Sequence, residues 1–164
     1  MTIEFTKMLT NNYHTFLSEL KEKIKNINAH EDELVMLKYL FLPSLGNGHF
    51  TIFLIENKKN GSFKIAKQVW DYPNLQNHIG IYDTDKIVVT KKEICLQPNE
   101  QDKLKQMIGK VDLSVLDSNK GIFLDGAVHK FSISYNGEIK EYEWITEKDK
   151  AVKKLEKYLT SFFN

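Results

Sequence analysis

The stretch "FLDGAVHKFSISYNGEIKEYEW" (residues 123–144) decides the fold of this chain, because its Asn136-Gly137 pair predicts a hairpin of known register. Asn-Gly is the preferred pair for a two-residue type I′ turn, and each step outward then pairs one residue from each strand. Counting outward gives the cross-strand pairs of one face: Tyr135–Glu138, Ile133–Lys140, Phe131–Tyr142 and His129–Trp144. The sequence therefore predicts which side chains share a face of the sheet.

This aromatic-rich face is predicted to be the core face. Cross-strand aromatic pairs stabilise a sheet, whereas the alternate pairs carry mostly polar side chains. Those alternate pairs are Ser134–Ile139, Ser132–Glu141, Lys130–Glu143 and Val128–Ile145. We expect the second face to be mostly wet, with an ion pair between Lys130 and Glu143. We interpret His129 as a packed histidine beside the Trp144 indole.

The Asp125-Gly126 dipeptide predicts a second turn, which joins "GIFL" (121–124) to "AVHKF" and makes a three-stranded meander. A catalytic dyad of His129 and Asp125 is an alternative interpretation of the same residues. No nucleophile lies nearby in the sequence, so we favour a packed histidine and a turn aspartate.

Three segments have the apolar spacing of amphipathic helices. The first covers about residues 12–28, and the second, "PNEQDKLKQMIG" (98–109), starts at Pro98 and ends at Gly109. The third follows Thr146 and Asp149, which have the spacing of a capping box. Its apolar stripe is Ala151, Val152, Leu155, Leu159, Phe162 and Phe163.

The remaining segments are predicted to be strands, with one exception. Residues 33–42 are apolar almost all round, which leaves helix and strand equally open. "HFTIFLIE" and "FKIAKQVW" (49–70) flank an Asn60-Gly61 turn signal, which predicts a hairpin whose first strand is covered on both faces and whose register stays open. "KIVVT" and "EICLQ" are predicted as two further strands.

Together these segments predict one α+β domain over residues 1–164. We expect a mainly antiparallel sheet with an N-terminal helix, a short central helix and a C-terminal amphipathic helix, the helices lying on one face.

Composition excludes several classes of function. The chain has 23 lysines, no arginine and a formal net charge of +1, so neither a basic nucleic-acid surface nor an arginine clamp is expected. The N-terminus lacks a secretory signal and no apolar run would span a bilayer, so we expect a cytoplasmic protein with no membrane or nucleic-acid partner. Cys95, the single cysteine, is expected to be a small buried hydrophobe.

The segment "QVWDYPNLQNHIGIYDTD" (68–85) is the predicted partner-binding surface, because loop aromatics pack or bind, and Trp and Tyr are favoured at interfaces. The residues in question are Trp70, Asp71, Tyr72, His78, Tyr82, Asp83 and Asp85. His78, Asp83 and Asp85 could instead ligate a divalent metal, but their spacing matches no defined site. We therefore predict no metal and no cofactor.

The C-terminal pattern "LDG…HKFSISYNGEIKEYEW" followed by an amphipathic helix resembles small single-domain bacterial proteins, among them immunity proteins that neutralise toxins. The resemblance covers about the last quarter of the chain and implies a protein partner, but no residue roles. The near-neutral charge departs from the acidity expected of nuclease inhibitors. The leading hypothesis is thus a non-enzymatic protein-binding module, an immunity protein for a cognate toxin. The alternative is a small-molecule-binding protein or hydrolase that uses His78, Asp83 and Asp85, or His129 and Asp125.

Overall fold

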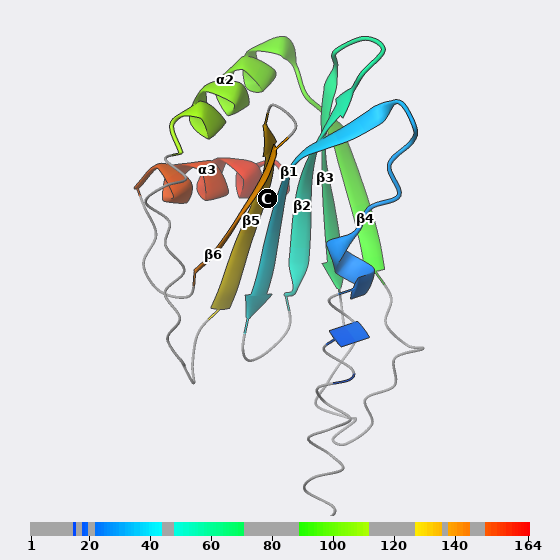
Figure 1. Cartoon of the computed structure of the whole chain (residues 1–164), viewed down its shortest axis with the longest axis vertical. Coiled ribbons are helices and arrows are strands. Elements are labelled where there is room, and N and C mark those ends of the chain that lie inside the picture. Colours follow the sequence, from blue (N-terminus) through cyan, green and yellow to red (C-terminus); the bar gives the residue numbers. More distant parts are fainter. Residues whose placement is uncertain are drawn as a thin grey trace, which may run out of the picture.

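The computed structural model describes residues 15, 18–19, 22–43, 48–70, 89–111, 127–135, 138–144 and 150–164, although not the side chains of Tyr135, Glu138, Tyr142 and Trp144. Six strands form one sheet in the order β4-β3-β2-β1-β5-β6, and every neighbouring pair is antiparallel (Figure 1). The strands are β1 (Glu33–Pro43), β2 (Phe50–Asn57), β3 (Phe63–Trp70), β4 (Val89–Cys95), β5 (Ala127–Tyr135) and β6 (Glu138–Trp144). Two helices, α2 (Pro98–Gly109) and α3 (Lys150–Ser161), cover one face. The α+β prediction is therefore correct in outline.

Strand β1 resolves the segment that the sequence left open between helix and strand. It lies inside the sheet, paired with β2 on one side and β5 on the other. Leu37 and Tyr39 are buried on the face that α3 covers, while Leu40 and Leu42 alternate with them and are buried too. A strand inside a sheet with both faces covered needs no polar face, which is why periodicity alone could not identify it.

The β2–β3 hairpin forms as predicted. The amides of Asn57 and Gly61 close its loop through bonds to the carbonyls of Ser62 and Asn57, each 2.8 Å long, and Gly61 has a φ of +67°. The register that the sequence left open pairs Leu54 with Ile65. Every β2 side chain from residue 51 to 55 is buried, which confirms that this strand is covered on both faces.

The β5–β6 hairpin has the predicted register at every paired position, from Tyr135–Glu138 to His129–Trp144. Phe131 and Ile133 lie in the core on the helix-covered face, as expected, and His129 is buried on the same face. Lys130 does face Glu143 in the register, but the predicted ion pair has another partner, because Lys130 Nζ lies 2.9 Å from Glu141 Oε2. Long side chains reach diagonal neighbours across a strand pair, and that reach explains the difference.

The strand predicted at residues 121–124 lies outside the described residues. The predicted three-stranded meander is wrong, because the neighbour of β5 on the side away from β6 is β1, which pairs with it from Leu37–Ile133 to Pro43–Ala127. The C-terminal hairpin therefore joins the four-stranded meander of β1 to β4 through β1.

The described helices begin close to the predicted positions. Helix α2 starts at Pro98, where Gln97 N donates to Glu100 Oε2 at 2.8 Å and completes a capping box. Helix α3 buries Val152, Leu155 and Leu159, three members of the predicted stripe. The predicted capping residues Thr146 and Asp149 lie outside the described part of the chain.

The placement of all helices on one face is wrong. The N-terminal helical segment ends at Lys25 instead of near residue 28, and the chain continues across the face opposite α2 and α3 (Figure 1). There Ile27 packs against a cluster formed by Phe53, Ile55 and Ala66. Because β2 is apolar on both faces, its second face also needs cover.

Strand β4 corrects two further predictions. "KIVVT" and "EICLQ" do not form two strands, since one continuous strand runs from Val89 to Cys95 through Lys91 and Lys92. This strand is the edge of the sheet, where lysines are compatible with β structure and discourage further pairing. Cys95 is exposed instead of buried, because the inward positions belong to its neighbours Ile94 and Leu96.

Among the residues that the structure describes, no helix combines the length and apolar character needed to cross a membrane.

Candidate functional site

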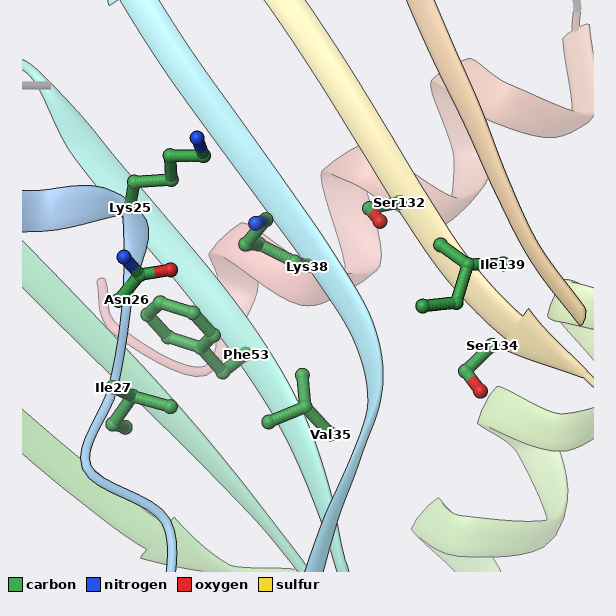
Figure 2. A pocket seen from close by; sticks show the side chains of 9 residues that line it. All are labelled: Lys25, Asn26, Ile27, Val35, Lys38, Phe53, Ser132, Ser134 and Ile139. Carbon is green, nitrogen blue, oxygen red and sulfur yellow. The ribbon is translucent and has the colours of Figure 1, made fainter. Parts of the chain in front are cut away.

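A pocket of about 220 Å³ lies on the sheet face opposite α2 and α3 (Figure 2). The N-terminal segment forms one wall, and β1, β2, β5 and β6 form the rest. We call it the Lys38 pocket; its lining residues are Lys25, Asn26, Ile27, Val35, Lys38, Phe53, Ser132, Ser134 and Ile139. This is the face that the hairpin register predicts to be mostly wet.

An irregularity in β1 shapes this pocket. The register of β1 against β2 shifts between Val35 and Leu37, as in a β-bulge. Met36 and Leu37 both pack in the core under the helices, whereas Val35 packs on the opposite face. The β1–β5 pairs also stop at Leu37, so Val35 and Ser134 line the pocket where the two strands no longer pair.

Lys38 lies in the middle of this face. The strand registers place it directly opposite Phe53 on β2 and Ser132 on β5, and Figure 2 shows it between them. The Lys38 side chain is half-buried, and this partial burial lowers the pKa of its ammonium group; the nearby charge of Lys25 lowers the pKa further. The fold thus holds a cation where its charged form is disfavoured.

Two neighbouring lysines have carboxylate partners, whereas Lys38 has none in direct contact among the residues that the structure describes. Lys25 Nζ lies 3.5 Å from Glu22 Oε1, and Lys130 is paired with Glu141. Within the described parts of the chain, the Lys38 ammonium makes no hydrogen bond and no ion pair. Among the described residues, Lys38 is therefore a positive charge with no carboxylate in direct contact, and the charges of Glu141 and Glu22 act on it only at longer range.

The pocket also has an apolar rim. Ile139 on β6 is 71% exposed, although it is a large hydrophobic side chain, and it lies opposite Ser134 in the β5–β6 register. A pocket lined by both an exposed isoleucine and a lysine matches the mixed apolar and polar character of protein interfaces.

Replacing Lys38 by methionine is expected to raise the melting temperature, because methionine fills the site without a desolvated charge. The folded-state pKa of Lys38 lies below its ordinary value of 10.5, so its unfavourable contribution is fully present at neutral pH. That contribution disappears as the pH rises through the folded-state pKa toward 10.5. The gain in stability should therefore be measurable by calorimetry at pH 7 and smaller at pH 10. The matched control Lys153→Met, at an exposed position of α3, should show no such gain.

A second cluster lies on the other face of the sheet, under α3. The Tyr39 hydroxyl donates to Glu156 Oε1 at 2.5 Å and lies 2.8 Å from His129 Nδ1. Since the single hydroxyl hydrogen is directed to the carboxylate, His129 Nδ1 carries the hydrogen that the Tyr39 oxygen accepts. The three residues form a chain of hydrogen bonds that ties β1 and β5 to α3.

The surroundings of this cluster are aromatic. The His129 ring is stacked on the Tyr39 ring, with ring centroids 6.0 Å apart, and lies edge-on to Phe41, with ring centroids 5.0 Å apart. Burial raises the pKa of the Tyr39 hydroxyl far above its ordinary value of 10.0, and the adjacent Glu156 carboxylate raises it further. Tyr39 therefore remains a neutral hydrogen-bond donor, and we interpret the cluster as a structural link between α3 and the sheet.

This pKa shift predicts a loss of stability in alkali. The folded-state pKa of Tyr39 is raised, so its stabilisation is fully present below pH 10.0 and is lost as the pH rises above that value. Between about pH 9 and 11, the wild type should lose ~1.4 kcal/mol more unfolding free energy than Tyr39→Phe, which has no group to ionise. Urea titrations at each pH would measure the difference, and parallel pH profiles would contradict it.

The predicted partner-binding residues fall largely outside the described structure. Trp70 is described: its side chain is 2% exposed and lies edge-on to His49, with ring centroids 5.1 Å apart. The predictions for Asp71, Tyr72, His78, Tyr82, Asp83 and Asp85 concern residues that the structure does not describe, as does the one for Asp125. The surface proposed at residues 70–85 stays a prediction.

Sequence reasoning identified His129 but not its partners. Tyr39 is 90 residues from His129 in the chain, and Glu156 is 117 residues from Tyr39. The signal in the sequence is a charged residue directly after Leu155 in the buried stripe of α3, which places Glu156 near the boundary of the apolar face. Its contact with β1 depends on how α3 packs.

In the described part of the chain, no group of three or more His, Cys, Asp or Glu residues is close enough to hold a metal ion. Comparisons with protein-family models, with curated proteins and with solved structures found no match to this chain.

Proposed function

We propose that this chain is a non-enzymatic protein-binding module of the immunity type, which binds and inhibits a cognate bacterial toxin in the cytoplasm. The observation that carries the proposal is the Lys38 pocket, which is lined by a half-buried lysine with no direct carboxylate contact among the described residues and by a largely exposed isoleucine, Ile139. A protein surface of this kind gains stability when a partner covers its apolar rim and supplies a counter-charge to its cation.

The unfavourable contribution of Lys38 to folding supports a binding role for this face of the sheet. Lys38 is held at a cost to the folded state, and residues that cost stability are common where function requires them. The strands that carry the Lys38 pocket are held in place by the core on the other face of the sheet, where Leu37, Tyr39 and Ile133 are all at most 2% exposed. Side chains on paired strands of a sheet offer a partner a preformed surface.

The test is a search for the partner among the products of adjacent genes. The purified chain is mixed with the product of a neighbouring toxin-like gene, and the mixture is passed over a sizing column. We expect co-elution, and we expect co-expression to restore growth to cells that produce the toxin. Separate elution together with unrelieved toxicity, for every neighbouring product, would contradict the proposal.

A second candidate is a small-molecule-binding protein or hydrolase. The observation that favours it is His129, whose Nδ1 is oriented by Tyr39 in a chain that ends on a carboxylate, an arrangement that catalytic histidines also use. The test is His129→Ala in any hydrolase assay in which the wild type is active. Unchanged turnover in a folded variant would eliminate this role.

A further inference from the structure

We propose that the Lys38 pocket receives a carboxylate side chain from an acidic segment of the protein partner. This inference rests on the proposed function and adds to it the chemistry of the group that the partner presents.

Charge complementarity indicates the carboxylate. Among the described residues around the pocket, the ion pairs Lys25–Glu22 and Lys130–Glu141 leave one net positive charge, on Lys38, on which the two glutamates act only at longer range. One carboxylate supplies one negative charge, so it balances the pocket where a doubly charged phosphate would exceed it. A charge-assisted hydrogen bond to the half-buried ammonium would also restore the solvation that the folded chain removes.

Hydroxyl groups beside Lys38 are suited to the second carboxylate oxygen. Ser132 is the β5 residue opposite Lys38, and among the described residues its hydroxyl makes one long hydrogen bond of 3.5 Å, to Glu141 Oε1. Ser134 lies two residues further along the same face and lacks a hydrogen-bond partner among the described residues. A serine hydroxyl can donate to a carboxylate oxygen while the lysine binds the other.

Size and shape indicate a side chain instead of a whole ligand. The pocket of about 220 Å³ is smaller than the roughly 300–1,000 Å³ typical of sites that enclose a small molecule. Ile27, Val35 and Ile139 give it apolar walls that can pack against the methylene groups of a glutamate. Ile139 on the rim would then contact the neighbouring residues of the same segment.

The first experiment measures the pocket without the partner. A hexapeptide of alternating glycine and glutamate is titrated into the ¹⁵N-labelled chain, with the glycine–glutamine hexapeptide and inorganic phosphate as comparison probes. We expect saturable amide shifts at Lys38, Ser132 and Ser134 with the glutamate peptide only. These shifts should vanish in Lys38→Met and persist in Lys153→Met. Equal shifts with the glutamine peptide, or tighter binding of phosphate, would overturn the proposal.

The second experiment uses the toxin product that co-elutes with the chain. Lys38→Met should weaken its affinity at least tenfold, because the partner's carboxylate is left without its cation, whereas Lys153→Met should leave the affinity unchanged. Co-elution with unchanged affinity in Lys38→Met would overturn the pocket's role while the proposed function stands. Peptide shifts at Lys38 without any co-eluting product would count against the function and support the pocket.

Discussion

Replacing Phe131 by alanine is expected to lower the free energy of unfolding by about 3–5 kcal/mol, the largest effect of any substitution considered for this chain. Phe131 is fully buried on β5, and its ring lies 4.8 Å from that of Tyr39. The loss combines the transfer free energy of the ring with the cavity that remains between the sheet and α3. Chemical denaturation followed by circular dichroism would measure it.

The matched control is Ser132→Ala, the next residue on the same strand. Its side chain lies on the opposite face, in the Lys38 pocket, so its removal should change stability by less than about 0.5 kcal/mol. The contrast between adjacent positions tests the register of the C-terminal hairpin directly. Comparable losses at the two positions would mean that the assigned core face is incorrect.

The second large effect is expected at Glu156. Changing it to alanine should lower the free energy of unfolding by about 2–3 kcal/mol, because the buried Tyr39 hydroxyl loses a charged acceptor. His129, whose Nδ1 lies 3.5 Å from the same carboxylate oxygen, loses part of its surroundings as well. Glu156→Gln keeps an oxygen acceptor at this position and should recover a measurable part of the loss.

A double-mutant cycle separates the hydrogen bond from other effects. If Tyr39 and Glu156 act through their mutual bond, Glu156→Ala should cost much less in the Tyr39→Phe background than in the wild type. We expect a coupling free energy of about 1–2 kcal/mol, in the range for hydrogen bonds to charged groups. Additive losses would show that Glu156 stabilises α3 in another way.

The sequence alone predicted the C-terminal hairpin in detail. An Asn-Gly turn sets which residues face each other, and side-chain alternation then assigns each residue to a face. The β2–β3 turn was predicted in the same way, as were the start of α2 and the buried stripe of α3. These features depend on residues that are close together in the chain, where turn geometry and periodicity act directly.

Other features required the tertiary structure. Residues 33–42 form a strand because β2 and β5 pair with them on either side and both of their faces are covered. A uniformly apolar segment does not indicate which neighbours it will have, so its sequence could not decide between helix and strand. The predicted burial of Cys95 is wrong. Successive side chains of β4 point to opposite faces, and Ile94 and Leu96 take the inward positions, so Cys95 is exposed. The position of the N-terminal segment, which crosses the second face of the sheet, was also decided only by the tertiary structure.

The opening stretch shows where this division falls. Its letters determined that His129 shares a face with Phe131 and that Ser132 and Ser134 lie on the other. Only the tertiary structure decided what each face meets: Tyr39 and Glu156 on one side, Lys38 and the N-terminal segment on the other. Local rules set the direction of a side chain, whereas its partners depend on long-range packing, in which segments far apart in the chain are brought together to bury apolar surface.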